Sequence, residues 1–158
     1  SNVGKSSTIN VITKVNGLAK TSSFPGKTTE INIFLINEKF YLIDLPGYGF
    51  ARMSLEERAK LQNLINSYLF NSSYEQSRVV MIIDAVVGPT ADDMEMLQAL
   101  EQHGKQIVVA ANKIDKIKSS EYHKQMKKIH DKIGRYLVVP YSTKTKKGLG
   151  ELIDAIVG

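Results

Sequence analysis

Three short segments carry side chains with the chemistry to bind a nucleotide and a metal ion. They are residues 4–6 (GKS), 44–47 (DLPG) and 112–115 (NKID), in this order along the chain. A lysine with backbone N–H groups can hold phosphates, and one aspartate can hold Mg²⁺. A second aspartate can recognise a purine base. Each segment is a modest signal by itself, but together they predict one site for a guanine nucleotide with Mg²⁺.

The first segment matches the end of the phosphate-loop pattern GxxxxGK[ST], which lies between a strand and a helix. Lys5 would place a positive charge between the outer phosphates, and the Ser6 hydroxyl would bind Mg²⁺. N–H groups at the helix N-terminus would point at phosphate oxygens. An isolated GKS could also begin an unrelated helix, so the prediction of a nucleotide site depends on the other two segments as well. The predicted phosphate-contacting residues are Asn2, Val3, Gly4, Lys5, Ser6 and Ser7.

The second segment supplies a metal ligand and a contact to the terminal phosphate. Asp44 follows apolar residues and can hold Mg²⁺, usually through water. After the turn at Pro46, the Gly47 N–H can reach a γ-phosphate. Thr28 is the preferred second hydroxyl ligand for Mg²⁺, and Thr29 is its competitor. The expected metal ligands are Ser6, Thr28 and Asp44, and the expected catalytic groups are Lys5, Thr28 and Gly47.

The third segment can select guanine. The Asp115 carboxylate can accept hydrogen bonds from guanine N1–H and the 2-amino group, whereas adenine offers neither donor and would leave the carboxylate unpaired. Asn112 can bond to the opposite base edge, and the stem of Lys113 can lie over the ring. A later loop could contact guanine O6 through backbone N–H groups, and its residues are Ser142, Thr143 and Lys144.

Apolar strands alternate with amphipathic helices along the chain, and these elements must position the three segments. Helices are expected at 5–16, 54–69, 90–104, 122–134 and 149–157, strands at 31–36, 40–45, 78–84, 106–111 and 136–141, and a loop at 17–30. The first two strands would form a hairpin through residues 37–39. Such alternation predicts an α/β fold with a mostly parallel sheet covered on both faces. Ligands of these sheets bind at the carboxyl ends of the strands, where the three segments would meet.

The bulk composition is that of one globular domain. The chain has 158 residues, of which 42% are hydrophobic and 23% charged. The absence of cysteine excludes disulfides and Cys-based zinc sites. No apolar run approaches the ~20 residues that cross a bilayer, so we expect no membrane contact and a cytoplasmic location. We also expect a monomer.

Positive charge is concentrated in one part of the chain. Residues 105–147 contain 12 Lys and Arg against 3 Asp and Glu, whereas residues 1–104 contain 9 against 11. A basic segment of this kind attracts polyanions such as RNA. The alternative is a solvated, lysine-rich helix without a partner, and charge alone favours neither interpretation.

Three stretches resemble the EngB family of ribosome-biogenesis GTPases. They are residues 1–10 (SNVGKSSTIN), 21–32 (TSSFPGKTTEIN) and 44–51 (DLPGYGFA), and the likeness extends over essentially the whole chain. The resemblance implies a three-layer P-loop GTPase domain, with Thr28 as the switch threonine. It implies Mg²⁺-dependent hydrolysis of GTP to GDP in assembly of the large ribosomal subunit, with links to cell division. The expected partners are the subunit or its precursors, through rRNA and ribosomal protein.

Two further expectations follow from the same resemblance. The family begins with another segment, so the chain is expected to lack the first strand of the domain and the start of the phosphate loop. Tyr48 stands where many GTPases have a glutamine that orients the attacking water. Without that glutamine, intrinsic hydrolysis should be slow. Some GTPases with a bulky residue at this position hold K⁺ beside the phosphates through an asparagine that matches Asn2, so K⁺ is a candidate cofactor here.

Two other functions compete with a GTP-hydrolysing switch. The first is a nucleotide-dependent RNA- or ribosome-binding module with negligible hydrolysis. The absence of the glutamine that orients the attacking water is compatible with this alternative. The second is a basic RNA-binding domain with a decayed nucleotide site. The intact Lys5, Ser6, Asp44, Asn112 and Asp115 argue against decay.

Overall fold

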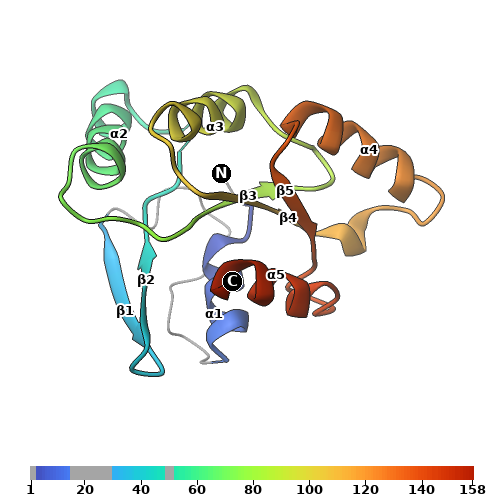
Figure 1. Ribbon diagram of the computed structural model, residues 1–158. Coiled ribbons are helices and arrows are strands. Elements are labelled where there is room, and N and C mark those ends of the chain that lie inside the picture. Colours follow the sequence, from blue (N-terminus) through green and yellow to red (C-terminus); the bar gives the residue numbers. More distant parts are fainter. Residues whose placement is uncertain (1–2, 15–29, 49–51) are drawn as a thin grey trace.

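The computed structural model describes residues 3–14, 30–48 and 52–158 (Figure 1). The described helices are α1 (Lys5–Thr13), α2 (Leu55–Phe70), α3 (Ala91–Gln102), α4 (Tyr122–Ile133), α5 (Leu149–Val157) and the short 3₁₀ turn η1 (Ile114–Lys116). The strands are β1 (Asn32–Ile36), β2 (Phe40–Asp44), β3 (Val79–Asp84), β4 (Ile107–Asn112) and β5 (Leu137–Pro140). The expected loop at 17–30 lies almost wholly outside the described residues.

The strands form two sheets in the described part of the chain. β3, β4 and β5 make a parallel sheet in that order, and β1 pairs with β2 in an antiparallel hairpin. The predicted α/β class and the predicted hairpin are confirmed. The expectation of a single sheet differs from what is observed, because no described strand joins β2 to β3. The expected additional strand before residue 1 stays a prediction.

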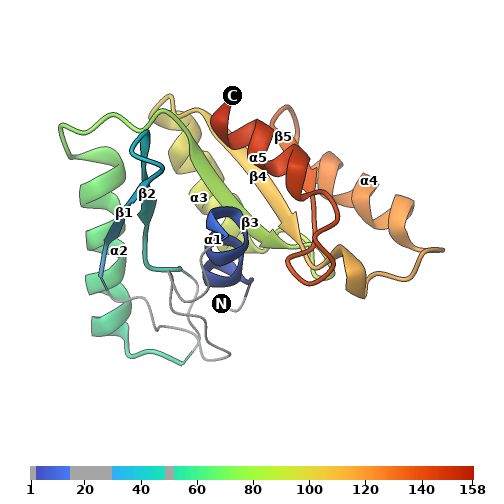
Figure 2. The same cartoon turned by 90° about the horizontal axis from the view of Figure 1, so that it is seen from below.

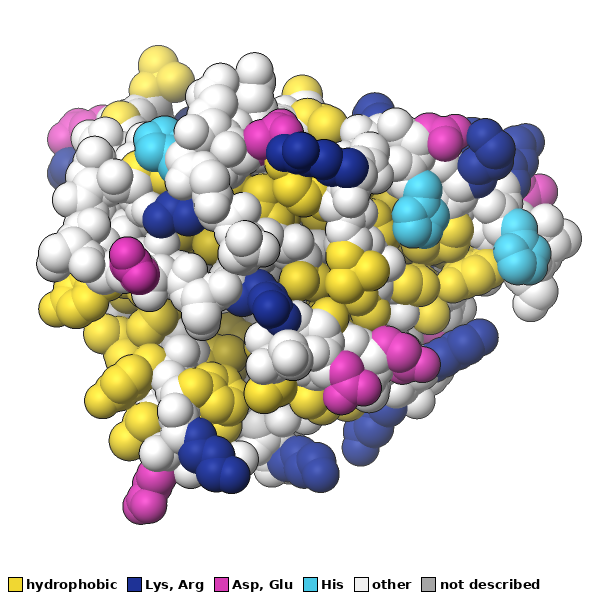
Figure 3. Space-filling model, in the orientation of Figure 1, with side chains coloured by type: hydrophobic (Ala, Val, Ile, Leu, Met, Phe, Trp, Pro, Cys, Tyr) yellow, Lys and Arg dark blue, Asp and Glu magenta, His cyan; other side chains and the backbone are white. Residues whose placement is uncertain are grey.

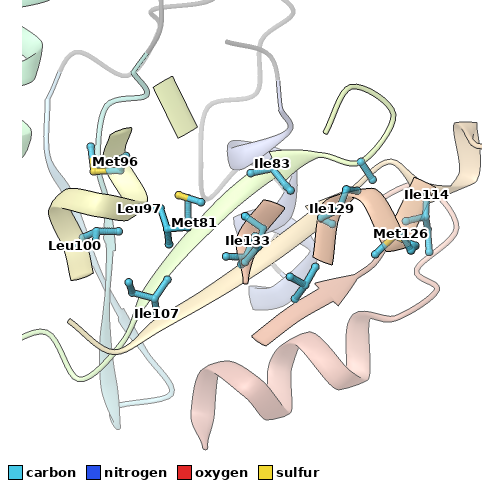
Figure 4. Close-up of a cluster of buried hydrophobic side chains, with 14 of the residues drawn as sticks. Met81, Ile83, Met96, Leu97, Leu100, Ile107, Ile114, Met126, Ile129 and Ile133 are labelled. Carbon is cyan, nitrogen blue, oxygen red and sulfur yellow. The ribbon is translucent and has the colours of Figure 1, made fainter. Parts of the chain in front are cut away.

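Two apolar clusters on opposite faces of the parallel sheet hold the layers together. One joins alternate residues of β3 and β4 to α2, α3 and α4, as Figure 4 shows for Met81, Leu97 and Ile129. The other joins the intervening strand residues to Leu152 of α5 and Ile12 of α1. Figure 1 accordingly shows α1 and α5 below the sheet, with α3 and α4 above it, and Figure 2, the view from below, shows α1 and α5 in front of the sheet. This three-layer arrangement follows from strands that are apolar on both faces, and every residue of β4 is buried.

Local sequence signals explain most helix boundaries. Ser54 and Glu57 form a capping box at the start of α2, and α3 begins with an equivalent box formed by Thr90 and Asp93. The first helix is shorter than expected and ends at Thr13, because Lys14 adopts a left-handed backbone with φ 53°. Each element therefore ends close to its predicted limit, with the largest difference at α1.

Candidate functional site

The phosphate and metal segments meet in space although 39 residues separate them. Lys5 begins α1, and its ammonium group forms an ion pair with the carboxylate of Asp44 at the end of β2. Asp44 is only 3% exposed. A buried carboxylate needs a positive partner, and Lys5 supplies one. The predicted convergence of these two residues is confirmed by this contact.

The residues around this ion pair fit a magnesium–phosphate site. No group of three or more His, Cys, Asp or Glu side chains that could hold a metal occurs within residues 3–14, 30–48 and 52–158. Mg²⁺ bound beside a nucleotide usually takes only one or two carboxylates, with phosphates and water as further ligands. Asp44 together with the Ser6 hydroxyl in the first turn of α1 offers such a donor set.

Asn112 connects the base segment to the phosphate segment. Its side chain is 1% exposed, and its Nδ2 donates to the Val3 carbonyl at 2.9 Å. Its Oδ1 accepts from the backbone N–H groups of Lys113, at 2.8 Å, and of Thr143, at 3.2 Å. An amide nitrogen carries two hydrogens, so one remains for the predicted base contact. Close packing here requires Gly4, since a Cβ at that position would lie 2.5 Å from Asn112 Nδ2.

The carboxylate predicted to select guanine is supported by a buried serine. Asp115 is exposed, and its Oδ1 accepts a 2.7 Å hydrogen bond from the Ser142 hydroxyl, which is fully buried. The Ser142 oxygen also accepts the backbone N–H of Lys144 at 3.2 Å. This network presents Asp115 to solvent with a fixed orientation, as recognition of a base requires.

The N–H groups expected to meet guanine O6 have partners within the protein. The Thr143 N–H donates to Asn112, and the Lys144 N–H donates to Ser142. A contact with O6 would therefore have to share or replace these bonds. Ser142 instead contributes through its hydroxyl, a role that the sequence did not indicate.

Asp84 is a site residue to which the sequence analysis gave no role. It ends β3 directly beside Asn112 of β4, and its Oδ2 forms a 2.9 Å ion pair with Lys113 Nζ. Its Oδ1 accepts the Val86 N–H at 2.8 Å. Lys113 itself has a left-handed backbone with φ 69°. The pairing fixes the side chain that is predicted to cover the base.

Tyr48, which follows Gly47, is directed into the protein. Its ring packs against the larger apolar cluster, and its hydroxyl donates to Asp93 Oδ1 at 2.8 Å. Burial, followed by the neighbouring charge of Asp93, raises the pKa of Tyr48 well above its usual range. Asp93 is itself buried and caps α3 by accepting the Thr90 N–H at 2.8 Å. Tyr48 therefore links the segment after β2 to the start of α3.

Two predicted ligands cannot be placed. Asn2 and Thr28 lie outside the described residues, as does the competitor Thr29. Their predicted contacts with phosphate and metal stay predictions, and so do the nucleotide contacts of Ser7 and Gly47.

Comparison with known proteins identifies the family. The chain is 45% identical over 157 residues to a protein of Clostridium perfringens (strain SM101) named probable GTP-binding protein EngB, and the match covers 98% of this chain and 79% of that protein. The chain belongs to the EngB family of GTP-binding proteins. An EngB protein of Lachnospira eligens is 42% identical over 159 residues, covering 99% of this chain and 75% of the relative.

A family model and solved structures support the same domain type. The family model described as ferrous iron transport protein B matches residues 1–156. A crystal structure of an EngB protein has a TM-score of 0.81 at 23% identity and covers 99% of this chain and 92% of that one. Era in complex with MgGDPNP and nucleotides of 16S ribosomal RNA has a TM-score of 0.77 at 26% identity, covering 99% and 52%. The predicted EngB membership and P-loop GTPase fold are confirmed.

None of the helices in the described ranges has the length and apolar character needed to span a bilayer. The cytoplasmic location and the monomeric state expected from the sequence stay predictions.

Proposed function

We propose that this GTPase binds GTP and GDP with Mg²⁺ and acts as a GTP-hydrolysing switch in assembly of the large ribosomal subunit, which in turn supports cell division. The observation that carries the nucleotide part is the connected set of side chains from distant segments. Lys5 pairs with Asp44, Asn112 bonds to Val3, and Ser142 bonds to Asp115. Family membership and this geometry support the same chemistry independently.

The ion pair suggests how the site receives a nucleotide. Lys5 would exchange Asp44 for phosphate oxygens, and Asp44, Ser6 and Thr28 would hold Mg²⁺. When bound, Mg²⁺ would neutralise negative charge on the phosphates. Lys5 and Asp44 would each exchange one ionic contact for another, so the buried carboxylate and its partly exposed partner would both stay compensated.

Hydrolysis is proposed to be slow without a partner. The Tyr48 hydroxyl is bonded to Asp93, and a phenol lacks the side-chain amide with which a glutamine orients the attacking water. K⁺ held by Asn2 is a proposed substitute for the missing glutamine. Hydrolysis rates in potassium and in sodium buffers test this, and equal rates would remove the ion from the proposal.

The ribosomal part of the proposal rests on charge and on family relationship. On α4, Met126, Ile129 and Ile133 are buried, while its lysines are exposed. Figure 3 shows Lys and Arg side chains over this helix at the upper right. An exposed basic helix fits the phosphate backbone of RNA. Co-sedimentation with large ribosomal subunits, in a GTP analogue and in GDP, tests whether the chain binds there in a nucleotide-dependent way.

Asp115→Asn tests the base recognition. The amide that replaces the carboxylate presents a donor where guanine also has donors, so GTP and GDP should bind at least about 100-fold more weakly. Xanthine has an oxygen in place of the 2-amino group, so xanthosine diphosphate should bind better than to wild type. Titrations with fluorescent nucleotides measure both effects.

Asp131→Asn is the matched control for this variant. Asp131 is an exposed carboxylate on α4, paired with Lys127 and remote from the motifs. It should leave both affinities unchanged. Guanine binding by Asp115→Asn as tight as that of wild type would show that the base is recognised elsewhere.

A further inference from the structure

Two consecutive peptide groups of the phosphate loop are held by side chains through their carbonyls. The Val3 carbonyl accepts from Asn112, and the Gly4 carbonyl accepts from the Thr8 hydroxyl at 2.7 Å beside the helical bond from the Thr8 N–H at 2.9 Å. A peptide group is planar, so a fixed carbonyl also fixes the direction of the next N–H. The two bonds therefore orient the N–H groups of Gly4 and Lys5, which the phosphate-loop pattern assigns to phosphate binding.

The Thr8 hydroxyl is in turn held by Tyr141. The two hydroxyl oxygens lie 2.7 Å apart, and the residues are 2% and 0% exposed. A threonine hydroxyl has a single hydrogen, which Thr8 gives to Gly4, so Tyr141 must be the donor to Thr8. Burial raises the pKa of Tyr141, and the phenol keeps its proton at neutral pH. The order of donation is therefore Tyr141 to Thr8 to Gly4.

Tyr141 also belongs to the base-binding side of the site. Its backbone N–H donates to Ala111 at 2.9 Å, and its carbonyl accepts the Ile114 N–H at 3.3 Å. The next residue is Ser142, which bonds to Asp115. Tyr141 is thus the sequence neighbour of Ser142, which holds the carboxylate of Asp115. Its hydroxyl also reaches the phosphate loop through Thr8.

We propose that Tyr141 is a positioning residue for nucleotide binding, which acts through Thr8 to orient the Gly4–Lys5 peptide toward the phosphates. This inference rests on the proposed function. It makes the phosphate loop and the base loop parts of one hydrogen-bonded unit. The competing interpretation is that the hydroxyl pair only stabilises the packing of α1 against the sheet.

Four proteins distinguish these interpretations: full-length wild type, Tyr141→Phe, Thr8→Val and the double variant. Tyr141→Phe should weaken GDP binding roughly three- to tenfold, the effect of one buried hydrogen bond. GMP binding should change much less, since GMP lacks the β-phosphate that the loop encloses. Competition titrations against a fluorescent nucleotide measure both affinities.

Thermal unfolding without nucleotide separates stability from positioning. Replacing both hydroxyl partners by apolar groups of the same shape leaves no buried polar atom unsatisfied, because the Gly4 carbonyl still accepts the Thr8 backbone N–H. The double variant should therefore recover much of the thermal stability lost in the single variants. Its GDP affinity should stay low, because the Gly4 carbonyl has still lost its side-chain donor.

Thr13→Val is the matched control. Thr13 lies on the same helix, and its hydroxyl donates to the Ile9 carbonyl at 2.8 Å with the same four-residue spacing as Thr8 to Gly4. This variant should bind GDP as wild type does. Unchanged GDP affinity in Tyr141→Phe, equal losses for GDP and GMP, or full recovery of affinity in the double variant would each overturn the inference. Lack of GDP binding by wild type would instead refute the proposed function, and the inference with it, before any variant is made.

Discussion

At the residue scale, Asp84 supports the predicted base site through its position in the fold, because it pairs with Lys113 although it belongs to no sequence motif. Asp84→Asn would remove the charge that pairs with Lys113 Nζ at 2.9 Å while keeping the shape of the side chain. Both groups are about one-fifth exposed, so the pair is only partly screened. We expect GDP and GTP to bind roughly three- to tenfold more weakly, by the same factor, because Lys113 is predicted to cover the base rather than to hold the phosphates.

Titration of both nucleotides measures this effect, and Asp131→Asn is again the control. The Lys127–Asp131 pair has a similar distance, 3.0 Å, but is highly exposed. A loss confined to GTP would place the action of Asp84 at the γ-phosphate and contradict the assignment.

The sequence predicted the site residues that occur in short motifs. Lys5, Asp44 and Asp115 could be proposed because each belongs to a motif whose spacing fits contacts with one ligand, and the ion pair between Lys5 and Asp44 confirms that two of the motifs meet. Asp84 and Tyr141 could not, because their partners are 29 and 133 residues away along the chain. Neither residue is part of a local pattern, so only the pairing of strands brings it to the site.

At the element scale, Gly148 controls how α5 begins beside β5. Its φ is 74°, and an added Cβ would lie 2.1 Å from the Pro140 carbonyl oxygen. Gly148→Ala should lower the free energy of unfolding by several kcal/mol, about 2–4, since backbone must move. Gly104→Ala is the control: its φ is 65°, with nothing within 4 Å, so about 1–2 kcal/mol of backbone strain is expected. Chemical denaturation of both variants checks the difference, and equal losses would contradict it.

Helix and strand limits could be predicted where capping chemistry is local. The boxes Ser54 with Glu57 and Thr90 with Asp93 satisfy backbone N–H groups within one turn, so they are visible in the sequence. The end of α1 was not visible. A left-handed residue at the end of a helix is usually glycine or asparagine, so a lysine at position 14 does not predict this conformation. It depends on how the chain leaves the helix.

At the scale of the whole molecule, the uneven charge predicts salt-dependent binding. Changing Lys124, Lys127, Lys128 and Lys132 to glutamate should reduce binding to large ribosomal subunits and flatten its salt dependence, because fewer counterions are released. GTP affinity should be unchanged. Lys127 pairs with Asp131 and Lys132 donates to the Pro89 carbonyl, so Lys124 and Lys128 alone should account for much of the loss.

A second set of four charge reversals provides the control for net charge. Lys14, Lys39, Arg58 and Lys60 are exposed residues of the first half of the chain. Changing these to glutamate alters the total charge equally, and co-sedimentation should fall less. Equal losses in the two variants would mean that overall charge, rather than α4, determines binding.

The fold class could be predicted, but the division of the strands into two sheets could not. Apolar strands alternating with amphipathic helices require helices on both faces of a parallel sheet. Which strands become neighbours depends on long-range pairing that no local pattern encodes. The hairpin carries exposed Ile33, Leu35 and Tyr41, and Figure 3 shows hydrophobic side chains gathered at the lower left, over this hairpin.

The bond between Tyr48 and Asp93 also has an optical consequence. The chain contains seven tyrosines and no tryptophan, so its ultraviolet emission is dominated by phenol rings. A phenol that donates to a carboxylate emits weakly, because its excited state passes the proton to the acceptor. Any nucleotide-driven movement that separates Tyr48 from Asp93 would therefore brighten the protein. Nucleotide binding would then be visible without a label, through a tyrosine at the position where many GTPases have a glutamine.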